Sequence, residues 1–200
     1  MGLPLVTRAE YKAYAGISST SMDTSIDVLI PKVSELVKSI CRRTFIDYIN
    51  DVKMEYSEGG ARSIELVETP ITQVISVEFS GDYGRSYDNL VEYEDYAVSK
   101  ATNSIRPIKA SSDSYSNNSP MFTEAINGYR ITYTGGYDTG IPEDLKVAVL
   151  DLLSYYLKND SAVHTHKLAQ PNTMQVEYIA STNLPAHIKR ILDLYTVSYD

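Results

Sequence analysis

Apolar residues recur at intervals of three and four along two long stretches of the chain, as on one face of an α-helix. The first stretch begins near Asp23 and ends near Arg43, with a proline at position 31. Because proline removes a helical hydrogen bond and costs about 3 kcal/mol in a helix interior, we expect a kink there or a helix whose regular part starts close to Pro31. The second stretch begins at Pro142, ends near Lys158 and carries Leu145, Ala148, Val149, Leu152, Leu153 and Tyr156.

Two shorter helices are predicted near the ends of the chain. Thr7 and Glu10 have the spacing of a capping box, and Gly16 stands where a helix-ending residue is expected. Another amphipathic helix follows Pro185, and its apolar face consists of Ile188, Ile191, Leu192 and Tyr195. Residues 160–182 have no clear period apart from one extended piece at 174–179.

Between the helical stretches the hydrophobic period changes from three-and-four to two, which is typical of β-strands. Alternating segments cover residues 53–56, 63–66, 74–79, 93–99, 104–108 and 128–134. Two polar segments rich in turn-forming residues, 80–88 and 109–123, are expected to be exposed loops. The region therefore predicts antiparallel strands joined by turns.

Together these elements predict one α+β domain over residues 1–200, since a chain with 43% hydrophobic residues can bury a single core without metals or disulfides. We expect a mainly helical framework, made of the short helix, the long helix and the C-terminal helices. An antiparallel β region is inserted at about residues 50–135, and residues 183–200 form a C-terminal docking segment. The single cysteine, Cys41, excludes an intrachain disulfide and lies on the apolar stripe of the long helix, so we expect a core residue.

Charge and aromatic composition narrow the classes of function. The 26 acidic and 18 basic residues leave a net charge of −8. This charge argues against binding to the phosphate backbone of nucleic acids but suits a channel through which DNA must slide. The 17 tyrosines are typical of strands and contact surfaces that are partly exposed to solvent. No stretch is apolar enough for a membrane helix, and the N-terminus has no signal-like pattern, so we expect a cytosolic origin.

One pair of histidines has the spacing of metal ligands. On a strand, His164 and His166 would project to one face and could bind a metal with a third ligand such as His187. In a polar segment after a helix, solvated histidines are the simpler interpretation. No metal or other cofactor is predicted, and a small metal-dependent hydrolase built on His164 and His166 is kept as an alternative hypothesis.

Acidic residues cluster at Glu92, Glu94 and Asp95 and again at Glu143 and Asp144. Catalysis by paired carboxylates needs a pocket that gives them opposed environments. The first set lies beside a predicted strand start and the second at a predicted helix N-terminus, where charge placement alone explains carboxylates. Since the glycine pairs also lack the context of a phosphate-binding loop, no catalytic residue is predicted.

Five short segments occur in an informative order. They are CRRTF at 41–45, EY at 55–56, ETPI at 68–71 leading into VISV at 74–77, YRITYTGGY at 129–137, and IPEDLKVA at 141–148. With these segments in this order, residues 7–156 resemble the phage head-tail connector family, whose members are also called adaptor or head completion proteins. Residues 184–192 extend the resemblance more loosely.

The resemblance implies a structural protein of the virion neck, assembled in the host cytoplasm, rather than an enzyme. It implies a homo-oligomeric ring, such as a dodecamer, that lies under the portal vertex and extends the DNA channel. The implied partners are the portal protein, neighbouring copies, a stopper or tail-completion protein, and double-stranded DNA that passes through without sequence-specific binding; no membrane is involved. The alternatives are a tail-completion or terminator ring protein and a bacterial regulatory binding domain.

Candidate contact residues can also be named. Arg42 and Arg43 complement the negative end of the long helix, which is sufficient reason for them, and contact between subunits is the alternative hypothesis for this pair. The C-terminal segment is the candidate for portal docking, and its candidate residues are Pro185, Ile188, Arg190 and Tyr195. The candidates for contacts between subunits are Arg42 and Arg43, at the end of the long helix, and Tyr83 and Arg85, in the exposed loop at 80–88.

Overall fold

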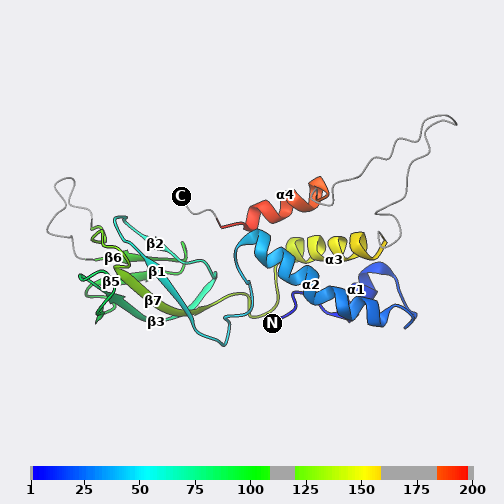
Figure 1. Ribbon diagram of the computed structural model, residues 1–200, viewed down its shortest axis with the longest axis horizontal. Helices are drawn as coiled ribbons and strands as arrows, with labels where there is room; N and C mark the ends of the chain where they lie inside the picture. Colours follow the sequence, from blue (N-terminus) through cyan, green and yellow to red (C-terminus); the bar gives the residue numbers. More distant parts are fainter. Residues whose placement is uncertain (1, 109–119, 159–183, 198–200) are drawn as a thin grey trace. The chain divides into compact units, whose positions relative to one another are not determined.

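The computed structural model describes residues 2–108, 120–158 and 184–197 (Figure 1). The chain divides into two compact units, a helical unit of residues 1–43 and 141–200 and a β unit of residues 44–140. The predicted extended piece at 174–179 and most of the predicted loop at 109–123 lie outside the described residues. That all 200 residues fold as one domain stays a prediction.

Within the described residues, four helices form the helical unit close to the predicted positions. They are α1 (Arg8–Ala15), α2 (Asp23–Cys41), α3 (Glu143–Lys158) and α4 (Ala186–Tyr195). The capping box of α1 is confirmed: the Thr7 hydroxyl accepts from the Glu10 amide at 3.2 Å, and the Glu10 carboxylate accepts from the Thr7 amide at 2.8 Å. Helix α2 begins at Asp23 and runs through Pro31, so it does not start beside the proline.

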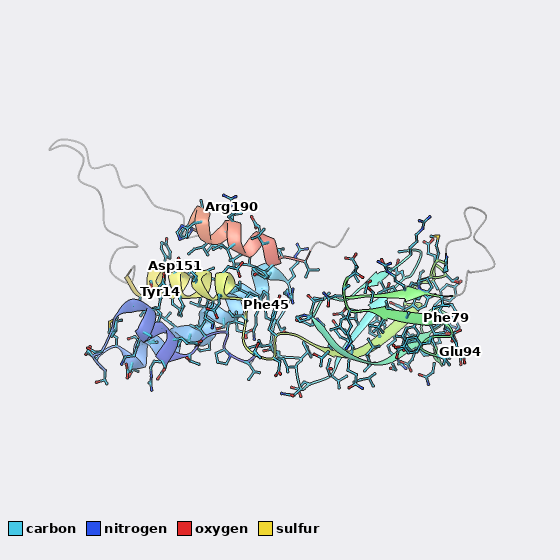
Figure 2. The ribbon with its side chains drawn as sticks, turned by 180° about the vertical axis from the view of Figure 1, so that it is seen from behind. Tyr14, Phe45, Phe79, Glu94, Asp151 and Arg190 are labelled. Carbon is cyan, nitrogen blue, oxygen red and sulfur yellow. The ribbon has the colours of Figure 1, made fainter. Side chains whose placement is uncertain are left out.

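The core of the helical unit forms where the apolar faces of the helices meet, and α2 contacts each of the other three. Cys41 is fully buried in this core, as predicted. Figure 2 shows Tyr14 of α1 beside Asp151 of α3, and the Tyr14 hydroxyl donates to the Asp151 carboxylate at 2.6 Å. The side chains that α2, α3 and α4 bury most completely are Ile26, Val33, Val37, Leu145, Ala148, Val149, Leu152, Leu153, Ile188 and Leu192.

Two antiparallel sheets form the β unit. Its strands are β1 (Lys53–Ser57), β2 (Ile64–Glu65), β3 (Ile71–Phe79), β4 (Asp88–Asn89), β5 (Tyr96–Ser99), β6 (Ser104–Pro107) and β7 (Tyr129–Gly135). The larger sheet has the strand order β1-β7-β3-β4, and the smaller sheet has the order β2-β6-β5. The longest pairing joins β3 to β7 and contains two register shifts, so extra residues are accommodated in β3.

Residues from both sheets contribute to one hydrophobic core of the β unit. On β7 the buried Tyr129, Ile131 and Tyr133 alternate with half-buried polar residues, so this strand has one inner and one outer face. The ring of Tyr129 lies 5.1 Å from that of Phe79 and 4.9 Å from that of Phe122. The core also contains Ile64, Leu66, Ile71, Val77, Tyr96 and Ile105.

The predicted mainly helical framework with an inserted β region was wrong. Two antiparallel sheets with a core of their own occupy a β unit of nearly half the chain, so the mixed α+β protein is β-rich rather than built on helices. The alternating pattern identified separate short strands. It did not show which strands pair with one another, because the pairing of β3 with β7 connects residues that are at least 50 positions apart.

A buried carboxylate fixes the point at which the chain enters the β unit. Glu68 has 0% of its surface exposed, and its oxygens accept hydrogen bonds from the amides of Thr44 and Phe45 at 2.9–3.2 Å. Its third partner is the Nζ of Lys53 at 3.1 Å, which also lies 3.1 Å from the carboxylate of Glu55. A buried charge is stable only when it is paired and hydrogen-bonded in this way.

Tyr133 extends this network onto β7. Its hydroxyl accepts from the Glu68 amide at 2.9 Å and donates to the Glu55 carboxylate at 2.6 Å. Burial and the hydrogen bond to Glu55 raise the pKa of Tyr133 well above its ordinary value. Burial disfavours the charge on Lys53, yet the carboxylates of Glu68 and Glu55 outweigh this effect and raise the pKa of Lys53. The network therefore holds a neutral phenol and a charged ammonium.

The chain leaves the β unit beside the point where it enters. The amide of Tyr137 donates to the carbonyl of Phe45 at 2.8 Å. A Cβ on Gly135 would collide with the carbonyl oxygen of Glu68, and a Cβ on Gly136 would collide with that of Phe45. Gly136 also has a φ of 125°, which disfavours other residues. The glycine pair is therefore required because the entry and exit segments leave no room for side chains.

We predict that Glu68→Gln lowers the free energy of unfolding by about 2–4 kcal/mol, because glutamine has one accepting oxygen where glutamate has two and leaves Lys53 without its buried counter-charge. Urea unfolding followed by circular dichroism measures the change. Glu65→Gln on the exposed side of β2 is the matched control and should change stability by less than about 0.5 kcal/mol. Equal effects of the two substitutions would contradict the role of Glu68.

Candidate interaction surfaces

The described residues hold no metal-binding cluster of three or more histidine, cysteine or acidic side chains. The predicted pair His164 and His166 lies outside the described residues. His187, its suggested third ligand, is an exposed residue of α4 whose Nε2 lies 3.7 Å from the carboxylate of Asp151. No helix of the described part of the chain is long and apolar enough to cross a membrane.

The acidic clusters hold local structure in place. The Asp95 carboxylate accepts from the amide of Val91 at 2.9 Å and closes the turn before β5. At the start of α3, the Asp144 carboxylate accepts from the amide of Leu145 at 2.9 Å and from the hydroxyl of Tyr195 at 2.6 Å. These hydrogen bonds fit the interpretation that local structure accounts for Asp95 and Asp144.

Helix α4 has an inner face that packs on the rest of the helical unit. Ile188 and Leu192 are fully buried, and the Tyr195 hydroxyl ties the end of α4 to Asp144 of α3. After the helix, the amide of Val197 donates to the carbonyl of Cys41 at 3.0 Å. Of the predicted docking residues, Ile188 and Tyr195 therefore hold α4 in position.

The outer face of α4 is exposed within the described residues. Figure 2 shows Arg190 on the side of α4 away from α3, and the residue is exposed. Pro185 is partly buried and occupies the position before the first residue of the helix. Leu194 is 75% exposed, which is unusual for leucine. We define the outer face of α4 as the exposed residues His187, Lys189, Arg190, Asp193 and Leu194.

The two arginines that end α2 differ in their surroundings. Arg42 is exposed and has a left-handed backbone, with a φ of 56°, where it terminates the helix. Arg43 is buried, and its amide donates to the carbonyl of Lys38 at 3.2 Å. Only Arg42 of this pair presents its side chain at the surface.

The predicted loop at 80–88 has a fixed shape and a strongly exposed tip. The Asp82 carboxylate accepts from the hydroxyl and amide of Ser86, from the hydroxyl of Ser80 and from the amide of Arg85, at 2.7–3.0 Å. The hydrogen bonds from Ser86, with those from Ser80 and Arg85, lower the pKa of Asp82 to about 2. Tyr83 is 70% exposed with a positive φ of 64°, and Arg85 is also exposed. The loop thus presents both predicted contact residues.

Sequence reasoning missed a row of exposed apolar residues that begins just before β1 and continues along it. Val52, Met54 and Tyr56 are each more than half exposed, at 53%, 51% and 56%. Alternation in the segment 52–56 separates apolar from charged positions, but the usual rule places the apolar set inside. Only the structure shows that the charged Lys53 and Glu55 face inward on this strand, so that its apolar side chains face outward.

The two units carry very different charges. The β unit has 15 acidic and seven basic residues, a net charge of −8 that equals the charge of the whole chain. The helical unit has 11 of each and is neutral. Acidic repulsion is therefore confined to the β unit, whereas the outer face of α4 has two basic residues, Lys189 and Arg190, and one acidic residue, Asp193.

A model of the family described as head completion protein matches residues 4–197, almost the full length of the chain. The chain belongs to the head completion protein family. This membership confirms the resemblance predicted from the order of the short sequence segments. The comparison with curated proteins finds no match.

Solved structures with a similar fold come from gene transfer agent particles. A chain in the neck of an empty particle, computed with C6 symmetry, has a TM-score of 0.55 and 12% identity, with 98% of this chain and 91% of that chain covered. A chain in the virion of the native particle has a TM-score of 0.56, also with 12% identity and the same coverage of both chains. The two similarities establish the fold over nearly the whole chain.

We predict that the tip loop keeps its shape to low pH. Because the folded pKa of Asp82 is depressed to about 2, its hydrogen bonds persist below the ordinary pKa of about 3.9 and are lost as the pH falls through about 2. The amide NMR signals of Arg85 and Ser86 should therefore stay constant between about pH 6 and pH 4.

Asp82→Asn removes the titrating group and is the matched comparison. In this variant the signals of Arg85 and Ser86 should show no transition near the pKa of Asp82. A wild-type transition centred at the ordinary aspartate pKa would contradict the hydrogen-bond network of the tip.

Proposed function

We propose that this head completion protein is a non-enzymatic adaptor of the virion neck, and that its copies form a ring joining the portal to the next neck or tail component. The observation that carries the proposal is the family match over residues 4–197. The similar fold of a chain from a particle neck supports it, because the likeness covers both units. The partners are the portal protein, neighbouring copies and a stopper or tail-completion protein.

The charge of the β unit supports a place beside the DNA channel. A surface with a net charge of −8 repels the phosphate backbone, so DNA can pass without being retained. Sequence-specific binding is not needed for this role. The ring therefore extends the channel and leaves the DNA free to move.

The outer face of α4 is the portal-docking surface in this proposal. Arg190 and Lys189 supply positive charge, and Leu194 supplies an exposed apolar anchor. Ile188 and Tyr195 act indirectly, since they fix α4 on the helical unit. Deleting the helix would remove core side chains as well as the docking surface, so surface substitutions give the cleaner test.

Contacts between subunits involve residues that the structure presents at the surface. The tip loop of the β unit offers Tyr83 and Arg85 on a rigid backbone, so little conformational entropy is lost on binding. Arg42 offers a cation at the end of α2. Arg43 supports the same helix end from a buried position.

The ring is tested with phage heads that were assembled without this protein. We predict that adding the purified chain places a ring at the portal vertex, which electron microscopy of the heads would detect. A monomeric protein that never associates with portal-bearing heads would contradict the proposal.

Docking through α4 is tested by reversing the charge of its outer face. The double variant Lys189→Glu and Arg190→Glu should attach to heads at least about tenfold more weakly, because two favourable charges become repulsive. Lys32→Glu, an exposed charge reversal on α2, is the matched control and should attach like the wild type. Circular dichroism checks that each variant is folded. Unchanged attachment of the double variant would refute docking by this face.

Metal content tests whether the protein is a metal-dependent hydrolase. We predict that the purified protein contains no stoichiometric metal by elemental analysis. Zinc or iron at one equivalent per chain, lost on His164→Ala, would instead support the metal-dependent hydrolase.

A further inference from the structure

The edge strand β1 carries its charged residues inward and its apolar residues outward. Lys53 and Glu55 have side chains only 19% and 15% exposed, and both belong to the network around Glu68. Met54 and Tyr56 alternate with them and are 51% and 56% exposed, and Val52 precedes them at 53%. This arrangement is the reverse of an ordinary half-buried strand, whose apolar residues face the core.

The neighbouring strands extend this apolar row into a wider surface. Tyr56 lies opposite Arg130 of β7, and the Arg130 guanidinium lies 4.2 Å from the ring centre of Tyr87. The rings of Tyr56 and Tyr87 are 6.5 Å apart. The Glu78 carboxylate binds Arg130 through two hydrogen bonds of 2.6 and 2.9 Å. We call the surface formed by Val52, Met54, Tyr56, Tyr87 and Arg130 the β1 face.

The fold of the β unit does not need these outward apolar side chains. The inward network already fixes β1, and the hydrophobic core consists of other residues. Tyrosine, methionine and arginine are the residues enriched in protein interfaces. An apolar row on an edge strand also invites association unless a partner covers it. The β1 face therefore has the composition of a contact surface.

Charge determines where the β units of two copies can make contact. β units of neighbouring copies each carry a net charge of −8, and opposing like charges across an interface costs several kcal/mol. Two β units can therefore approach most closely at a surface whose charges are internally balanced. The β1 face meets this condition, because Glu78 neutralises Arg130 and the other side chains are uncharged.

We propose that the β1 face is a contact between neighbouring copies of this chain in the assembled ring. The inference rests on the proposed function, since it needs the ring. A ring of more than two copies uses heterologous contacts, so the β1 face of one copy meets a different surface of the next copy. Met54 and Tyr56 lie in the centre of this contact and become inaccessible to water on assembly.

The test uses a thiol introduced at position 54. Cys41 is the only natural cysteine, is fully buried, and has a pKa that burial raises to about 11, so it reacts slowly with thiol reagents. Met54→Cys should be labelled readily by a maleimide in the free chain. On portal-bearing heads the labelling rate should fall at least about tenfold, because interface cores exclude water.

Tyr93→Cys is the matched control, since Tyr93 is 78% exposed and lies outside the β1 face. Its labelling rate should change by less than about twofold on assembly, as expected of a site outside the interface core. A short cross-linker from the thiol at position 54 should give a product with the mass of two copies of the chain.

The outcomes separate this inference from the proposed function. If the chain adds to heads but position 54 stays freely labelled, or is cross-linked to a different protein, the contact between copies is overturned while the adaptor role stands. If the chain never attaches to heads, the adaptor role fails and the proposed contact fails with it. Met54→Ser with Tyr56→Ser should also raise the concentration needed for ring formation at least about tenfold. The same thermal unfolding midpoint as the wild type would show that the variant is folded.

Discussion

The fully desolvated carboxylate of Glu68 is the constraint on which the β unit depends. A charge without access to water must find its partners within the protein, and Glu68 finds the amides of Thr44 and Phe45 and the ammonium of Lys53. These partners place the entering segment and β1. Because the carbonyl oxygen of Glu68 also abuts Gly135, the exit of β7 passes the same point. One residue, through its side chain and its backbone carbonyl, therefore organises segments that are far apart in sequence.

The network around Glu68 also determines which residues of β1 are exposed. Once Lys53 and Glu55 face inward to balance Glu68, alternation forces Met54 and Tyr56 to face outward. An apolar row would normally be removed from an edge strand, since it promotes association. Association is the role proposed for this head completion protein, so the inward charges and the outward apolar residues form one consistent arrangement.

The two units differ in charge, and this difference suits different roles. The β unit carries the whole net charge, which suits a position beside DNA, while the neutral helical unit presents two basic residues and one acidic residue on the outer face of α4. In the proposed function helix α4 serves both stability and docking, because its buried Ile188 and its exposed Arg190 lie on opposite faces. A segment assigned to docking as a whole thus contains residues with different roles, and only burial separates them.

By itself, the sequence determined the four helices, the capping box at Thr7, the position of Cys41 in a core, and the family, because these depend on local period, local hydrogen bonds and the order of short segments. Tertiary structure alone decided that the strands form two sheets with their own core, which corrected the helical framework predicted from local patterns. It also decided which face of β1 is buried. Alternation separates the two faces of a strand, but the buried charge of Glu68, 13 residues beyond Glu55, determines which of them turns inward.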